Sequence, residues 1–136
     1  MQGLDPEGKA PYSWQTNLDD VVAHHNPDVK WYTVPDKLLE LQKNKNYGQW
    51  QANGSVPVAF VAVNHTSGGN SGSPVLNSKG ALIGTNFDRA YEGTMSDYLF
   101  DPKRCRNISV DIRYTLFVLD KFGGAGWLLQ ELNFVP

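Results

Sequence analysis

A serine at position 71 lies in a glycine-rich loop whose composition suits a nucleophile. Residues 66–74 read TSGGNSGSP. Attack on an amide carbonyl needs two backbone N–H groups that converge on the developing oxyanion, and we expect those of Gly69 and Ser71 to do so. Glycine at 69 permits the required turn, and Gly72 leaves room for an acyl group. The pattern predicts Ser71 as a covalent nucleophile, with Asn70 bracing the loop through hydrogen bonds to nearby backbone. The alternative is a plain glycine-serine hairpin loop.

A nucleophilic serine also needs a general base and an acidic residue that orients the base. Only 70 residues precede Ser71, and the chain holds three histidines: His24, His25 and His65. We interpret all three as structural or exposed, with a base among them as the alternative. No carboxylate can be assigned as the third member of a triad. The chain by itself is therefore expected to lack the base and acid of such a site.

The composition excludes several classes of function. The chain has 136 residues, 40% of them hydrophobic, and its net charge is −2 from 12 basic and 14 acidic residues. A globular protein is predicted, and nucleic acid is not an expected partner. No apolar run approaches the roughly 18 residues of a membrane span, and we expect no signal peptide in the residues after Met1. Cys105 stands alone, so we predict a small buried residue, and no metal or cofactor is expected.

Hydrophobic periodicity and turn residues predict the elements around the loop. Helices are expected at 18–24, capped by Asn17, and at 35–44, 113–122 and 127–132. Strands are expected at 57–63, 73–77, 81–87 and 108–111, with a turn at Asn53-Gly54. Residues 90–106 are predicted to be a long irregular loop. The four tryptophans are expected to pack inside the protein: Trp14, Trp31, Trp50 and Trp127.

Two bacterial families share the serine motif. Residues 68–75 look like the glutamyl endopeptidases. A wider set of motifs, spread over roughly residues 30–136, resembles the dipeptidyl-peptidases of trypsin-like fold that carry a large helical insert and release N-terminal dipeptides. The motifs of that set are NHTSGGNSGSPVLN at 64–77, LIGTNFDR at 82–89, EGTMSD at 92–97, VDIRY at 110–114 and DKF at 120–122. This combination is far more specific than the serine loop, so we favour the dipeptidyl-peptidases.

The resemblance implies a mainly β fold with α-helices. It would be the C-terminal half of a chymotrypsin-like double β-barrel, with flanking helices at both ends. Residues 1–50 would be the end of the helical insert and a connecting segment, and residues 51–136 the C-terminal part of the catalytic domain. The triad histidine and aspartate would then lie outside this chain. The resemblance also implies a periplasmic, cell-surface or secreted location and a homodimeric full-length protein.

Asp88 and Arg89 follow Ser71 by 17 and 18 positions, at the end of a predicted strand. From the residues alone we favour an exposed Asp-Arg pair. The resemblance reverses this reading, because it implies that Asp88 binds the free amine of a peptide substrate and that Arg89 binds an Asp or Glu side chain next to the cleaved bond. A guanidinium suits that role because it donates two parallel hydrogen bonds to a carboxylate. The alternatives are a glutamyl endopeptidase-like protease and a non-catalytic trypsin-like module.

Overall fold

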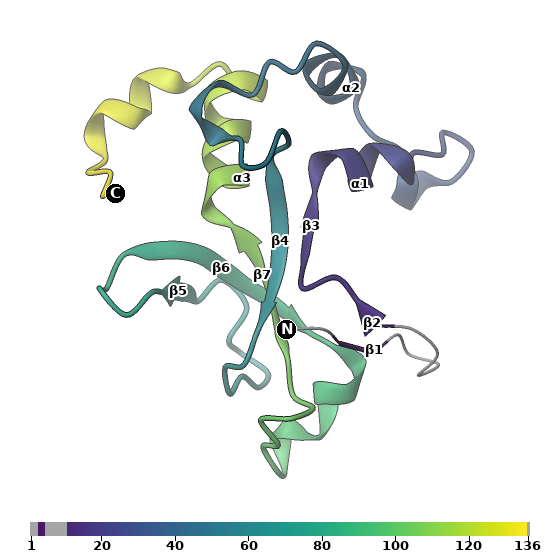
Figure 1. The fold of residues 1–136 in the computed structure, drawn as a ribbon, viewed down its shortest axis with the longest axis vertical. Coiled ribbons are helices and arrows are strands. Elements are labelled where there is room, and N and C mark those ends of the chain that lie inside the picture. The colour runs from purple at the N-terminus through teal and green to yellow at the C-terminus, as the bar shows by residue number, and fades with distance from the viewer. Residues whose placement is uncertain (1–2, 5–10, 136) are drawn as a thin grey trace. The chain divides into compact units, whose positions relative to one another are not determined.

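The computed structural model describes residues 3–4 and 11–135 (Figure 1). Its main sheet has five antiparallel strands in the order β3-β4-β7-β6-β5, and β1 pairs with β2 separately. The strands are β1 (Gly3–Leu4), β2 (Pro11–Tyr12), β3 (Gln15–Asn17), β4 (Pro57–Ala62), β5 (Pro74–Leu76), β6 (Leu82–Arg89) and β7 (Asn107–Asp111). The α-helices are α1 (Leu18–Ala23), α2 (Asp36–Lys43) and α3 (Ile112–Phe117), and η4 (Val118–Phe122) is a π-helix. Short 3₁₀ helices are η1 (Lys30–Tyr32), η2 (Gly48–Trp50), η3 (Tyr91–Asp97) and η5 (Gly126–Glu131).

Strand β6 is the longest strand of the main sheet, and it pairs with β5 on one side and β7 on the other. Its pairing with β7 is close at Gly84, where an added Cβ would lie 2.6 Å from the Val110 carbonyl oxygen and 2.8 Å from the Phe60 ring. Glycine at 84 is therefore required by close packing. The register shifts between Asn86 and Asp88, so β6 bends just before its last residues.

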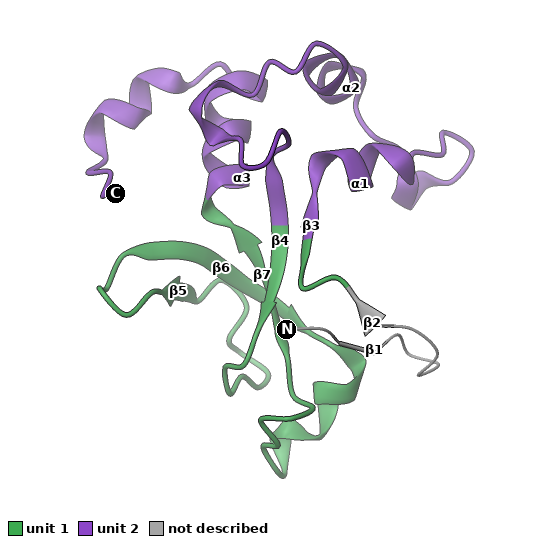
Figure 2. Ribbon diagram, in the orientation of Figure 1, with its two compact units in different colours: residues 1–15, 59–112 green, residues 16–58, 113–136 purple. Residues whose placement is uncertain are grey.

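The chain divides into two compact units (Figure 2). One contains residues 1–15 and 59–112, and the other contains residues 16–58 and 113–136. In the described part of the first unit the most buried side chains are mainly polar: Asn86, Ser96, Asn107, Ser109 and Asp111, with Ala90 and Cys105. The second unit holds an apolar core: Leu18, Val34, Leu38, Leu41, Tyr47, Trp50, Val56, Leu116 and Phe117. The predicted division at residue 50 concerns the domains of a longer protein and remains a prediction.

Local signals explain why the helices begin where they do. Asn17 accepts hydrogen bonds from the N–H groups of Asp19 and Asp20, and the Asp20 carboxylate accepts one from the Asn17 N–H, which completes a capping box for α1. Pro35 precedes α2, where a missing N–H costs nothing. At the predicted Asn53-Gly54 turn both residues have positive φ, of 54° and 86°. The predicted Asn17 cap and Asn53-Gly54 turn are confirmed, and the helix expected at 35–44 is observed at Asp36–Lys43.

Several predicted details are wrong. The expected loop 90–106 contains η3, and the expected helix 113–122 changes to a π-helix after Phe117. Only Trp50 among the tryptophans is buried, because its indole N–H donates to Asp120 at 3.0 Å and its ring lies against Phe134. Trp14, Trp31 and Trp127 are 48%, 86% and 66% exposed, and the helices that carry the last two, η1 and η5, have no buried residue.

The mainly antiparallel β architecture with helices before and after it agrees with the sequence analysis. The finer expectation, half of a chymotrypsin-like double barrel, remains a prediction. Cys105 is buried, as expected. No helix in the described residues is both long enough and apolar enough to cross a membrane.

Candidate active site around Ser71

The loop between β4 and β5 carries Ser71, and glycines with positive φ shape it. Gly69 has φ 96° and Gly72 has φ 87°, values that side chains rarely adopt. A Cβ at either position would meet nothing within 4 Å. Backbone conformation therefore requires these glycines, and the space beside Gly72, where we expect an acyl group, is open.

Asn70 and Asn86 brace the loop. The Asn70 side-chain oxygen accepts a hydrogen bond from the Ser67 N–H at 2.8 Å, as predicted. Asn86, on β6, donates its side-chain amide to the Asn70 carbonyl oxygen at 3.1 Å and accepts the Gly72 N–H on its own carbonyl at 2.8 Å. The Asn107 amide on β7 donates in turn to the Asn86 side-chain oxygen at 3.0 Å. These buried amides fasten the loop to the sheet, and the sequence analysis missed Asn86 and Asn107.

The two N–H groups expected to bind an oxyanion are available. The backbone N–H groups of Asn70, Gly72 and Ser73 donate to carbonyl oxygens of the chain. Those of Gly69 and Ser71 donate to no acceptor among the residues that the structure describes. The Gly68 N–H also has no acceptor among the described residues, so the open donors of this loop include the two expected positions and Gly68. Such N–H groups could accept negative charge from a ligand.

The Ser71 hydroxyl lies against the end of β6. Its Oγ donates a hydrogen bond to the Phe87 carbonyl oxygen at 3.2 Å. Phe87 directly precedes Asp88 and Arg89, so the predicted nucleophile and the predicted substrate-binding pair meet at one place. Asp88 is exposed, and its Oδ1 accepts the Arg89 N–H at 2.8 Å.

None of the three histidines donates to or accepts from Ser71 within the described residues. His65 Nε2 donates to the Ser96 carbonyl oxygen at 3.0 Å, and its ring stacks on Phe100. That nitrogen must carry a proton, because a carbonyl oxygen only accepts. His24 bonds to the Asp20 carbonyl through Nδ1 at 2.8 Å, and His25 accepts the Val34 N–H on Nδ1 at 3.0 Å. All three therefore make structural hydrogen bonds, as interpreted from the sequence.

Arg89 makes its strongest contacts with Asp97, at the end of η3. Its Nη1 and Nη2 each donate to one Asp97 carboxylate oxygen at 2.6 Å, and Nη1 also donates to Ser96 Oγ at 3.0 Å. The hydrogen bonds to Asp97 raise the pKa of Arg89, and those from Arg89 lower the pKa of Asp97. The sequence analysis missed this role for Asp97, although the motif EGTMSD that it singled out ends there.

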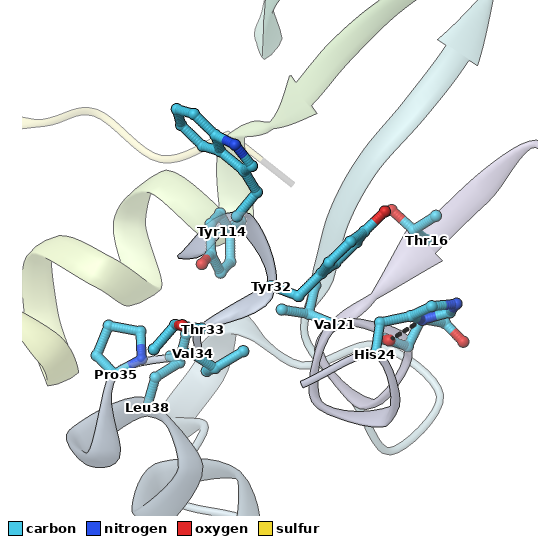
Figure 3. A pocket seen from close by; sticks show the side chains of 11 residues that line it. Thr16, Val21, His24, Tyr32, Thr33, Val34, Pro35, Leu38 and Tyr114 are labelled. Atoms are coloured by element: carbon cyan, nitrogen blue, oxygen red, sulfur yellow. Dashed lines mark hydrogen bonds between the residues drawn. The ribbon is translucent and has the colours of Figure 1, made fainter. Parts of the chain in front are cut away.

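A cavity of about 410 Å³ lies in the second unit and has a mostly aromatic and aliphatic wall (Figure 3). Trp31, Tyr32 and Tyr114 line it, and burial raises the pKa of Tyr114. His24 lies at its wall with its ring bonded to a backbone carbonyl (Figure 3). None of the predicted site residues lines this cavity, so it is not the predicted active site. The described residues contain no cluster of three or more His, Cys, Asp or Glu side chains suited to a metal ion.

Known proteins are similar in sequence to this chain over almost its whole length. It is 48% identical over 135 residues to the Asp/Glu-specific dipeptidyl-peptidase of Flavobacterium psychrophilum, and 40% identical over 135 residues to dipeptidyl-peptidase 7 of Porphyromonas gingivalis. Each match covers 99% of this chain and 19% of the relative, so the chain spans about a fifth of the length of these relatives. The crystal structure of Porphyromonas endodontalis DPP11 in complex with the dipeptide Arg-Asp superposes with a TM-score of 0.90 at 44% identity, over 96% of this chain and 19% of that one.

The family model of peptidase S46 matches residues 1–134. This result supports the predicted likeness to dipeptidyl-peptidases. The trypsin-like fold that the sequence analysis attached to that family remains a prediction. The chain belongs to the peptidase S46 family.

Proposed function

We propose that this chain forms part of the catalytic domain of a serine-type dipeptidyl-peptidase that prefers Asp or Glu at the second residue of its substrate. The observation that carries the proposal is the hydrogen bond from Ser71 Oγ to the Phe87 carbonyl, because it brings the nucleophile next to Asp88 and Arg89. The name of the Flavobacterium psychrophilum relative and the Arg-Asp dipeptide bound to Porphyromonas endodontalis DPP11 support this substrate preference. The chymotrypsin-like double barrel, the periplasmic or secreted location and the homodimer are further parts of the proposal.

Each site residue has a role that its chemistry allows. Ser71 Oγ attacks the carbonyl after the second substrate residue, and the N–H groups of Gly69 and Ser71 bind the oxyanion. The C–N bond then breaks, and the departing amine takes the proton that a general base removed from Ser71. Water hydrolyses the resulting ester and releases the dipeptide. Asp88 pairs with the substrate ammonium group, and Arg89 pairs with the acidic side chain.

The base has to come from residues outside this chain, since its histidines make other hydrogen bonds. By the full-length enzyme we mean this chain joined to the residues that supply the base. We expect this enzyme to release a fluorogenic amine from dipeptidyl substrates with a free N-terminus and Glu at the second position. Ser71→Ala should abolish turnover, whereas the matched control Ser73→Ala, two residues along the same loop, should keep it.

Three results would contradict the proposal. If peptidase activity survives the Ser71→Ala substitution, Ser71 is not the nucleophile. Equal cleavage of N-acetylated and free substrates would favour the glutamyl endopeptidase, since recognition of the amine by Asp88 would then contribute nothing. Slow reaction with a fluorophosphonate probe in the full-length enzyme would favour a non-catalytic module.

A further inference from the structure

The guanidinium of Arg89 is held from two sides by residues at the end of η3. The two Asp97 carboxylate oxygens accept one hydrogen bond each from Arg89 Nη1 and Nη2, and both N–O distances are 2.6 Å. Ser96 Oγ accepts a hydrogen bond from the second N–H of Nη1 at 3.0 Å. The Thr66 carbonyl oxygen lies 3.5 Å from the same nitrogen. Both hydrogens of Nη1 are therefore engaged, and three of the five guanidinium hydrogens have acceptors.

The two remaining hydrogens lie on one edge of the guanidinium. They are the Nε hydrogen and the outer Nη2 hydrogen, and no acceptor among the described residues takes either of them. These two N–H bonds are parallel and form the second fork that a guanidinium offers to a carboxylate. Asp97 thus occupies the terminal fork and leaves the side fork open.

Ser96 fixes Asp97 relative to the segment that leads into the nucleophile loop. Ser96 is buried, and its Oγ donates to the Thr66 carbonyl oxygen at 2.9 Å. Its carbonyl oxygen accepts the His65 Nε2 hydrogen at 3.0 Å. Thr66 lies five residues before Ser71, so Ser96 ties the end of η3, which carries Asp97, to the segment that leads to the nucleophile.

We propose that Asp97 is a positioning residue for substrate recognition: it orients Arg89 so that the Nε and Nη2 edge receives the acidic side chain of the substrate. This inference rests on the proposed role of Arg89. The Asp97 carboxylate partly neutralises the positive charge of Arg89, which by itself would weaken the attraction for an acidic substrate. It also holds the Arg89 side chain in place, so that this side chain loses little conformational freedom when substrate binds.

The test measures kcat and KM of the full-length enzyme on dipeptidyl substrates with Glu or Leu at the second position. Asp97→Ala should raise KM for the Glu substrate about 10- to 100-fold, leave kcat within about threefold, and change the Leu substrate little. Asp97→Asn keeps one acceptor oxygen and should recover part of the loss. Asp101→Ala is the matched control, because this carboxylate belongs to the same connection but pairs with Arg104 at 3.9 Å.

A double-mutant cycle separates this inference from the proposed function. If Arg89→Gly leaves the preference for Glu over Leu unchanged, the proposed role of Arg89 fails. If Arg89→Gly abolishes the preference but Asp97→Ala does not alter it, only the role of Asp97 fails. In the Arg89→Gly background, Asp97→Ala should have no further effect on the preference. Equal losses on both substrates, or a gain on Glu, would also overturn the inference, since Asp97 would then be merely structural or a competitor for Arg89.

Discussion

Gly84→Ala tests whether close packing between β6 and β7 holds the strand that carries Asp88 and Arg89. The new methyl group would lie 2.6 Å from the Val110 carbonyl oxygen and 2.8 and 3.0 Å from two ring carbons of Phe60. An ordinary contact is at least 3.4 Å. The Phe60 ring can turn aside, but the carbonyl belongs to the backbone of β7, so the two strands must separate by several tenths of an ångström.

The cost follows from that overlap. Overpacking of a fitted interior by one methyl group typically lowers the free energy of unfolding by about 1–3 kcal/mol, and contact with backbone places this case in the upper half of that range. For a chain of this size the melting temperature should fall by roughly 4–12 °C. Urea unfolding of the chain, followed by tryptophan fluorescence, measures the difference directly.

Gly68→Ala is the matched control, because its added Cβ meets nothing within 4 Å and its φ is not positive. We expect that variant to differ from the original chain by no more than about 0.5 kcal/mol. Equal stability of the two variants would refute the reasoning, since it would mean that β6 and β7 are not packed as closely as Gly84 requires.

Three further predictions concern the site. The chain by itself should show no measurable peptidase activity, because Ser71 has no base; turnover of a free dipeptidyl substrate that Ser71→Ala removes would contradict this. Arg89→Gly in the full-length enzyme should lower kcat/KM for Glu substrates roughly 100-fold and spare Leu substrates, as competition assays with both will show. Hydrogen bonds from Arg89 lower the pKa of Asp97 below its ordinary 3.8, so the stability from this pair is present above that value and is lost as the pH falls through the folded-state pKa. Unfolding from pH 2 to 7 should therefore show that the difference between the original chain and Asp97→Asn shrinks below about pH 4.

Local interactions made much of this chain predictable. The Asn17 cap, the proline before α2 and the Asn53-Gly54 turn act within a few residues, so their consequences can be read from adjacent positions. The same holds for the glycines around Ser71, since their positive φ values depend on the loop itself. The resemblance, carried by motifs over roughly residues 30–136, extended this to the family, whose model matches residues 1–134.

Buried polar partners were not predictable, because they join positions far apart in the chain. The Asn86 side-chain amide donates a hydrogen bond to the Asn70 carbonyl oxygen. The Asn86 side-chain oxygen accepts a hydrogen bond from Asn107, which lies 21 residues further along the chain. The bond between the two asparagines forms only once β6 and β7 are paired. An isolated asparagine in a strand carries no signal of such a role.

The partner of Arg89 is the clearest example of what tertiary structure decided. The sequence places Asp88 next to Arg89, and adjacency suggested an Asp-Arg pair at the surface. Successive side chains of a strand point to opposite faces, so Asp88 cannot present its carboxylate to the guanidinium of its neighbour. The 3₁₀ helix after β6 instead brings Asp97 back to Arg89, eight residues later. The sequence determined which residue types are present, and the turn of the chain through η3 determined which of them meet.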